Sequence, residues 1–171
     1  MCGIAGWFGN SVGCELERVA EVLRHRGPDG EAIWRDSESH AALVHTRLAI
    51  LDLSSAGAQP MGHDGSRDGA PARLTEGRSA RYWIVFNGEI YNFREVQRQL
   101  QDEGEVFHGN SDTEVLLRLL IRRGRAGLGE LAGMFAFAFY DRHTGAALLA
   151  RDAFGIKPLY YAAREGALAF A

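Results

Sequence analysis

Apolar residues recur along the chain with two periods, one typical of buried strands and one typical of helices that bury one face. Residues 4–8 form a continuous apolar run, which predicts a buried strand. Residues 16–23 place apolar side chains on a single helical face, and Gly27-Pro28 ends that pattern. Short strands are expected around residues 32–35 and 41–51.

The middle of the chain predicts a loop, a strand and two helices. Residues 62–81 are rich in Gly, Asp, Arg and Ser and lack periodicity, which predicts a long, mobile surface loop. A β-rich run at residues 82–86 predicts a strand. Asn92 and Ser111 are each followed three residues later by a glutamate, so both predict a capping box at the start of a helix.

The last third of the chain has strand character. Phenylalanine alternates with alanine or tyrosine over residues 135–140, and hairpin turns are expected at Thr144-Gly145 and Glu165-Gly166. Strands and helices are thus grouped along the chain rather than strictly alternating, which is typical of an α+β layered domain. The length of 171 residues fits one domain covering residues 1–171.

Composition excludes several classes of function. The 19 basic and 22 acidic residues are mixed along the chain and give a net charge of -3, so no nucleic-acid-binding face is expected. No apolar run approaches the roughly 20 residues of a membrane helix, and the N-terminus lacks a signal-peptide pattern. We therefore expect a cytoplasmic protein that binds neither nucleic acid nor a membrane.

Cys2 is the sharpest candidate for chemistry. If Met1 is removed, this residue carries both a thiol and a free α-amine of pKa about 7.7–8.0, so one residue supplies a nucleophile and its base. A Cys–His dyad, for example with His45, is an open alternative. Cys14 is expected to be a plain reduced thiol. The cysteines and histidines do not have zinc-site spacing, so no metal is expected.

Three further positions allow either a structural or a chemical role. Arg47 stands in an apolar stretch, where it could pair with a protein carboxylate or grip a substrate carboxylate with two hydrogen bonds. Asn87-Gly88 could be a plain turn or could supply two donors to a developing oxyanion. Asp112 is favourable at a helix start without any ligand, yet it could also receive a substrate ammonium group.

Several strings in a fixed order resemble the class II glutamine amidotransferases, which have an N-terminal nucleophile. The resemblance is closest to the glutaminase domain of glutamine-dependent asparagine synthetase and covers nearly the whole chain. The strings are CGIAG at 2–6, RHRGPDG at 24–30, HTRLAILDLS at 45–54, AQPM at 58–61, FNGEIYNF at 86–93, SDTEVLL at 111–117, GMFAFAFYD at 133–141 and RDAFGIKPLYY at 151–161.

The resemblance implies a four-layer αββα sandwich of the N-terminal nucleophile hydrolase type, and hydrolysis of L-glutamine to glutamate and ammonia. By this resemblance Cys2 would attack the side-chain amide, and Asn87 with Gly88 would form the oxyanion hole. The resemblance also implies a substrate-binding set, in which Arg47 holds the α-carboxylate, Asp112 holds the α-ammonium group, and Glu89, Ile50 and Leu51 line the pocket. Residues 26–29 are expected to be a structural loop.

The resemblance also implies a partner for this domain. The chain contains no SGGxDS loop, so the ammonia is expected to pass to an ATP-dependent synthetase domain or subunit that is absent from it. The chain would then be an excised fragment or a free-standing subunit, with no cofactor of its own and with ATP and Mg²⁺ confined to the synthetase. Two alternatives stay open: the same chemistry serving another carboxylate acceptor, such as a natural product, and a non-catalytic interaction module with this fold.

Overall fold

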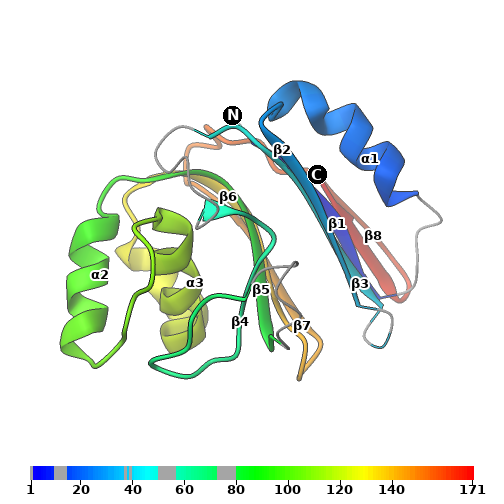
Figure 1. Ribbon diagram of the computed structural model, residues 1–171. Coiled ribbons are helices and arrows are strands. Elements are labelled where there is room, and N and C mark those ends of the chain that lie inside the picture. The colour runs from blue at the N-terminus through cyan, green and yellow to red at the C-terminus, as the bar shows by residue number, and fades with distance from the viewer. Residues whose placement is uncertain (1, 10–14, 37, 39, 50–56, 73–79) are drawn as a thin grey trace.

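Two antiparallel β-sheets lie face to face in the computed structural model, which describes residues 2–9, 15–36, 38, 40–49, 57–72 and 80–171 (Figure 1). The five-stranded sheet has the order β2-β3-β1-β9-β8, with β1 Gly3–Gly9, β2 Gly30–Asp36, β3 Ala41–Arg47, β8 Tyr161–Arg164 and β9 Ala167–Phe170. The four-stranded sheet has the order β4-β5-β6-β7, with β4 Met61–His63, β5 Tyr82–Ile90, β6 Gly133–Asp141 and β7 Ala146–Arg151.

Helices cover the outer face of each sheet, which confirms the predicted four-layer αββα sandwich (Figure 1). Helix α1 (Leu16–Leu23) lies on the five-stranded sheet and continues into a short 3₁₀ turn, η1 (Arg24–Arg26). Helices α2 (Phe93–Asp102) and α3 (Asp112–Arg123) lie on the four-stranded sheet, and α3 is followed by the 3₁₀ segment η4 (Gly124–Glu130). Within the described residues, no helix has the length and apolar character needed to cross a bilayer.

The predicted alternation over residues 135–140 separates two layers of the core. Phe135, Phe137 and Phe139 pack toward α3 with Leu116 and Leu117. The intervening residues of β6 face the other sheet, where the core consists of side chains from both sheets: Ile4, Phe8, Trp34, Leu43, Trp83, Val85, Ala136, Ala138, Tyr140 and Phe170. Strand β6 therefore contributes to both cores. Because its two faces must each bury apolar side chains, its register in the sheet is determined.

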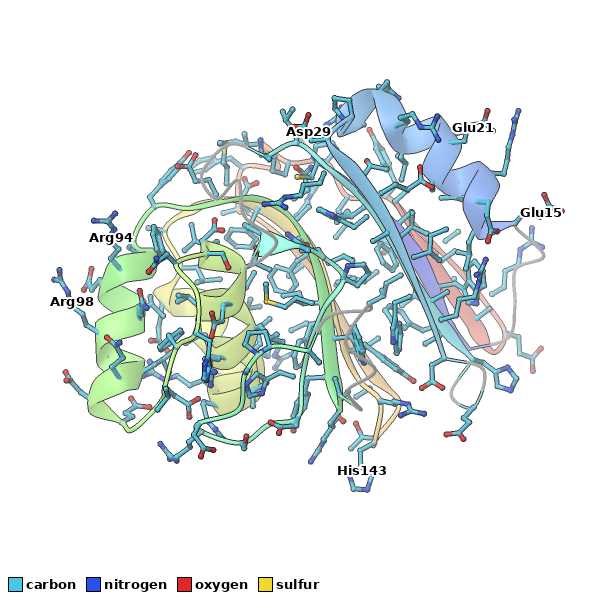
Figure 2. All side chains as sticks on the ribbon, viewed as in Figure 1. Glu15, Glu21, Asp29, Arg94, Arg98 and His143 are labelled. Carbon is cyan, nitrogen blue, oxygen red and sulfur yellow. The ribbon has the colours of Figure 1, made fainter. Side chains whose placement is uncertain are left out.

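Charged side chains lie on the outer surfaces of the helical layers. Glu21 projects from α1, and Arg94 and Arg98 project from α2, on the faces turned away from the sheets (Figure 2). The buried faces of these helices carry Ala20 in α1 and Leu100 in α2, each with no exposed side-chain surface. This polarity is that of amphipathic helices at the surface of a layered domain.

The structure alters several predicted boundaries and caps. The strand expected at 82–86 continues to Ile90, so Asn87-Gly88 lies within β5 and is not a turn. The strand expected at 41–51 ends at Arg47. Ser111 caps α3, since its Oγ accepts from the Glu114 N–H at 3.2 Å. The capping box at Asn92 is wrong.

Tertiary contacts explain why Asn92 does not cap α2. Its side-chain amide donates to the Glu130 carbonyl at 2.8 Å and accepts from the Ala132 N–H at 2.9 Å. The same side chain cannot also accept from the first turn of its own helix, and the structure gives it no side-chain cap bond. Asn92 thus joins the start of α2 to the segment that leads into β6.

The mobile loop predicted for residues 62–81 is wrong for the part that the structure describes. Its first residues form β4, which pairs with β5. Arg118 of α3 is fully buried and donates to the carbonyl oxygens of Arg67 at 3.2 Å and Gly69 at 2.6 Å. A buried guanidinium needs such acceptors, so this segment is held against α3. Residues 73–79 lie outside the described residues.

Candidate active site

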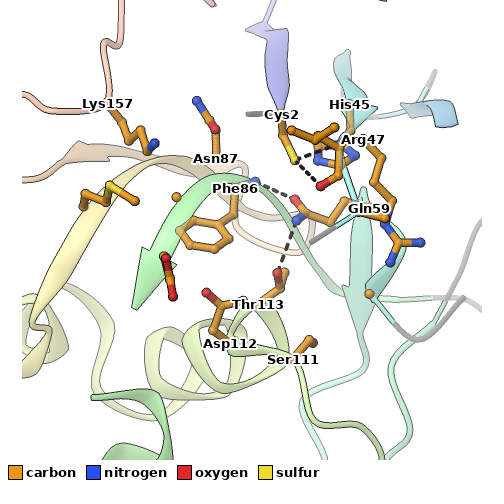
Figure 3. A pocket seen from close by; sticks show the side chains of 16 residues that line it. Cys2, His45, Arg47, Gln59, Phe86, Asn87, Ser111, Asp112, Thr113 and Lys157 are labelled. Atoms are coloured by element: carbon orange, nitrogen blue, oxygen red, sulfur yellow. Dashed lines mark hydrogen bonds between the residues drawn. The ribbon is translucent and has the colours of Figure 1, made fainter. Parts of the chain in front are cut away.

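Cys2 immediately precedes β1, a central strand that pairs with both β3 and β9. Its Sγ lies 3.5 Å from the Leu48 N–H, which donates to it, and 3.8 Å from the Leu48 carbonyl oxygen. The side chain faces a cavity of about 150 Å³ (Figure 3), which is large enough for a small organic molecule. The predicted nucleophile therefore lies at a cavity wall.

Thr46 anchors the start of β1 beside the nucleophile. Its Oγ1 accepts from the Gly3 N–H at 3.2 Å and donates to the Leu23 carbonyl at 3.0 Å. One fully buried hydroxyl thus ties β1, β3 and the end of α1 together. These bonds restrict the backbone next to Cys2.

The loop at residues 26–29 shapes the segment that follows β3, as the structural interpretation predicted. The Asp29 N–H donates to the Arg47 carbonyl at 2.9 Å, and the Asp29 carboxylate accepts from the Ala49 N–H at 2.9 Å. A Cβ at Gly27 would lie 2.3 Å from the Thr46 carbonyl oxygen, so only glycine permits this close approach. The loop therefore holds Arg47 and its neighbours at the cavity.

Strand β5 presents a backbone N–H to the cavity at Gly88. Asn87 pairs with Ala136 and Gly88 with Phe135 on β6, and N–H groups of an antiparallel strand point alternately to its two sides. The Phe86 and Ile90 N–H groups, two residues on either side of Gly88, both donate away from β6, to side chains outside the sheet. The Gly88 N–H therefore points to that same side, into the cavity that Gly88 lines.

The Asn87-Gly88 pair combines two donors at one wall of the cavity. The Asn87 side chain is buried and lines the cavity (Figure 3), so its amide is available beside the Gly88 N–H. A Cβ at Gly88 would lie 2.2 Å from the Met134 carbonyl oxygen, which excludes any larger residue without movement of the sheet. Two preorganised donors of this kind can stabilise a developing oxyanion.

Asp112, the first residue of α3, provides a buried carboxylate at the opposite wall. Its Oδ2 accepts from the Ile90 N–H at 3.1 Å. Burial raises the pKa of Asp112, and the nearby charge of Glu89 raises it further, against the lowering effect of its backbone hydrogen bonds. An ammonium group bound beside this carboxylate would offset the cost of keeping it ionised.

The predicted site residues that the structure describes converge on this one cavity. Its lining includes Cys2, Arg47, Asn87, Gly88, Glu89 and Asp112. The other two predicted residues, Ile50 and Leu51, lie outside the described residues. Across the described parts of the chain, no group of three or more His, Cys, Asp or Glu residues is placed to hold a metal ion.

His45 also faces this cavity, but its environment argues against the Cys–His dyad. The side chain is 1% exposed, and burial, followed by the positive charge of Arg47, lowers its pKa to about 3. No described residue forms a hydrogen bond with its Nε2. A base with so low a pKa holds a proton too weakly to take one from a thiol of ordinary pKa about 8.5.

Sequence reasoning gave no role to several side chains that line the cavity, and three of them are polar. Gln59, Thr113 and Lys157 are all buried there, and each belongs to one of the strings that carried the family resemblance. Lys157 had a visible signal, since it is the only lysine of the chain. The carboxylate of Asp152 accepts from the backbone N–H groups of Ile156 and Lys157, both at 3.0 Å, and so places this lysine at the cavity.

A family model described as a glutamine amidotransferase domain matches residues 1–171. The chain belongs to this family. Asparagine synthetase [glutamine-hydrolyzing] 1 of Bacillus subtilis is 34% identical over 168 residues, which are 94% of this chain and 24% of that protein. Asparagine synthetase B [glutamine-hydrolyzing] of Escherichia coli is 37% identical over 165 residues, 94% of this chain and 26% of that protein.

A third relative has a different name. Amidase chry2 of Gibberella zeae is 38% identical over 154 residues, 90% of this chain and 21% of that protein. The amidotransferase chain described here thus spans about a quarter of the length of these curated relatives. Its similarity to them is confined to one part of each.

A solved structure supports the fold. The glutamine phosphoribosylpyrophosphate amidotransferase of Bacillus subtilis, solved with ADP and GMP, matches with a TM-score of 0.69 at 21% identity. The match covers 98% of this chain and 41% of that one. The amidotransferase domain therefore shares the fold of that structure, in agreement with the predicted four-layer αββα sandwich.

Proposed function

We propose that this domain hydrolyses the side-chain amide of L-glutamine to glutamate and ammonia, with Cys2 as the nucleophile. The observation that carries the proposal is the shared cavity. Cys2 and Gly88 line it together with Arg47 and Asp112, so a thiol, a backbone N–H and two opposite charges share one cavity. An amino acid with a side-chain amide carries the matching groups.

In the first step, Met1 having been removed, the α-amine of Cys2 accepts the thiol proton while Sγ attacks the side-chain amide carbon of glutamine. The amide oxygen becomes an oxyanion and accepts hydrogen bonds from the Gly88 N–H and the Asn87 side chain. The α-ammonium group then gives its proton to the amide nitrogen. The C–N bond breaks, and ammonia leaves a thioester on Cys2.

In the second step, water attacks the thioester carbon while the same α-amine takes a proton from that water. The oxyanion forms again at Gly88 and Asn87. The C–S bond then breaks, the thiol recovers its proton, and glutamate leaves. One glutamine and one water have become one glutamate and one ammonia.

Recognition of the amino-acid end falls to the charged residues of the cavity. Arg47 would donate two parallel hydrogen bonds to the α-carboxylate, which the planar guanidinium allows. Asp112 would accept from the α-ammonium group, with Glu89, Ile50 and Leu51 completing the pocket. These contacts would orient the side-chain amide over Cys2.

We infer that the ammonia passes to an ATP-dependent synthetase of the asparagine-synthetase kind, in the cytoplasm. The support is the identity of 34% and 37% to two proteins named as glutamine-hydrolysing asparagine synthetases. The proposed hydrolysis uses the thiol and amine of one residue, so ATP and Mg²⁺ would serve the synthetase step and not this domain.

A different acceptor for the ammonia is the second candidate. Amidase chry2, which is not named as an asparagine synthetase, is as similar to this chain as the two synthetases are. Co-incubation of this domain with candidate synthetase partners, ATP, glutamine and either aspartate or another carboxylate distinguishes the two acceptors. Asparagine formation supports the first candidate, and glutamine-dependent amidation of another carboxylate supports the second.

Steady-state glutaminase activity of the Met1-free protein tests the proposal directly. We expect glutamate release by the wild type, none by Cys2→Ala, and unchanged release by the matched control Cys14→Ala. An electrophilic glutamine analogue should label Cys2 alone. Absence of turnover by correctly processed protein would contradict the proposal and favour a non-catalytic interaction module. Full activity with Met1 retained would contradict the α-amine of Cys2 as the base.

A further inference from the structure

The side chain of Gln59 bridges two elements that form opposite walls of the cavity. Its Oε1 accepts from the Phe86 N–H of β5 at 2.6 Å, and its Nε2 donates to Thr113 Oγ1 of α3 at 3.2 Å (Figure 3). The Phe86 N–H can only donate, so the amide oxygen must face β5 and the amide nitrogen must face α3. Gln59 itself is only 7% exposed.

The register of β4 explains why a side chain makes this contact. Met61 pairs with Ile84 and His63 with Tyr82, and continuing this antiparallel pairing would place Gln59 opposite Phe86 and Gly57 opposite Gly88. Strand β4 begins only at Met61 instead. Gln59 therefore satisfies the next donor of β5 with its side chain, and the backbone pairing that would have covered Gly88 does not form.

Two side chains consequently border the Gly88 N–H along the edge of β5. Gln59 holds the Phe86 N–H on one side, and Asp112 holds the Ile90 N–H on the other. Asp112 and Thr113 are consecutive residues in the first turn of α3. Both ends of this β5 edge are thus fixed to the same helical turn, one directly and one through Gln59.

We propose that Gln59 is a positioning residue for amide hydrolysis: it keeps the β5 edge open at Gly88 and fixes that edge relative to the first turn of α3. The inference rests on the proposed glutaminase function. Its consequence is geometric, because the edge carries the oxyanion donors and the turn carries the carboxylate for the α-ammonium group. Gln59 then sets the distance between the reacting end and the recognition end of the bound glutamine.

Gln59→Met tests the inference, since methionine is similarly long and unbranched but forms neither hydrogen bond. We expect kcat to fall roughly 100-fold, as displacement of reacting groups by about 1 Å can do, with a much smaller rise in KM. The rate at which iodoacetamide alkylates Cys2 should match the wild type, because the nucleophile is untouched. A KM effect alone, or unchanged kinetic constants in a folded protein, would overturn the inference.

Thr113→Val is a second variant that keeps the bond from Phe86 to Gln59 and removes only the link to α3. A hydrogen bond contributes about 0.5–1.5 kcal/mol, so we expect kcat to fall by up to roughly 10-fold. Adding Thr113→Val to Gln59→Met should cause no further loss, because the link is already broken. Full additivity would refute the coupling. Wild-type kcat for Thr113→Val would refute it even if Gln59→Met failed to fold.

Asn92→Leu is the matched control, because Asn92 is another side-chain amide that bridges two backbone segments but does not line the cavity. It should lower the melting temperature and leave kcat unchanged. If Asn92→Leu and Gln59→Met reduced kcat equally, the effect of Gln59 would be general destabilisation. If the wild type did not turn over glutamine at all, the proposed function itself would fail first, and this inference with it.

Discussion

Burial of His45 makes the stability of the fold depend on pH in a way that one substitution can isolate. Its folded pKa is about 3, whereas an unfolded histidine has a pKa of about 6.5. As pH falls below about 6.5, the unfolded chain binds a proton at this site and the folded chain does not. The depressed folded pKa therefore costs stability as pH falls, until the pH reaches about 3.

The size of this effect follows from the two pKa values. Each pH unit below the unfolded pKa costs up to about 1.4 kcal/mol, so pH 5 lies far enough below it to cost about 2 kcal/mol relative to pH 7. For a domain of this length, that loss corresponds to about 4–8 °C in melting temperature. Other carboxylates and histidines add their own pH dependence, which is common to the wild type and to a His45 variant.

Urea unfolding of the wild type and His45→Gln at pH 7 and pH 5 measures the contribution. The free energy of unfolding of the wild type should fall by about 2 kcal/mol more than that of the variant over this interval. His143→Gln, which removes a histidine that points away from the fold (Figure 2), should behave as the wild type does. Equal pH dependence in the wild type and His45→Gln would refute a buried, neutral His45.

Three further predictions concern the cavity and the helix behind it. Arg47→Lys keeps the charge but loses the two-bond geometry, so kcat/KM should fall roughly 10- to 150-fold, mainly through KM; unchanged KM with a lower melting temperature would instead indicate a structural ion pair. Because the pKa of Asp112 is raised, KM for glutamine should rise on acidification at a higher pH than for an ordinary aspartate. Asp112→Asn should raise KM for glutamine and abolish this rise of KM on acidification. The substitution should not lower the free energy of unfolding at pH 7, because a carboxyl group with a raised folded pKa stabilises the fold only at low pH. Arg118→Met should lower the free energy of unfolding, measured in urea, by about 3–5 kcal/mol. It leaves the buried carboxylate of Glu114 without its cation and removes one of the cations paired with Glu105. A loss below about 1 kcal/mol would contradict this.

Local sequence patterns were sufficient to predict helices and strands whose apolar residues recur with a regular period. The alternation over residues 135–140 predicted the strand and also which residues share a face, because a strand between two cores must bury both of its faces. The helix predicted from four apolar positions in residues 16–23, with a stop expected near residues 26–28, is α1 followed by the 3₁₀ turn η1, which ends at Arg26. The strings of the family resemblance then indicated the residues that meet at the cavity.

Sequence patterns did not predict side chains that form hydrogen bonds with segments far away in the chain. Asn92 has the sequence signature of a cap, but the Glu130 and Ala132 backbone, about 40 residues later, takes up its amide. Gln59 reaches Phe86 and Thr113 only because of the register between β4 and β5, which no local period encodes. Such contacts depend on the assembled fold and are therefore invisible to periodicity.

Because β4 begins only at Met61, the described residues leave one backbone pairing position unfilled along the edge of β5, at Gly88. Exposed sheet edges usually attract whole strands, which is a route to aggregation. Here side chains already occupy the N–H donors of Phe86 and Ile90, so of these three alternate residues only Gly88 can offer its N–H to an incoming backbone. In the proposed reaction, the amide oxygen of glutamine accepts a hydrogen bond from the Gly88 N–H, as the carbonyl of a neighbouring strand would have done. A peptide strand would find its neighbouring positions blocked, so the same edge that recruits a small amide is protected from pairing with another chain.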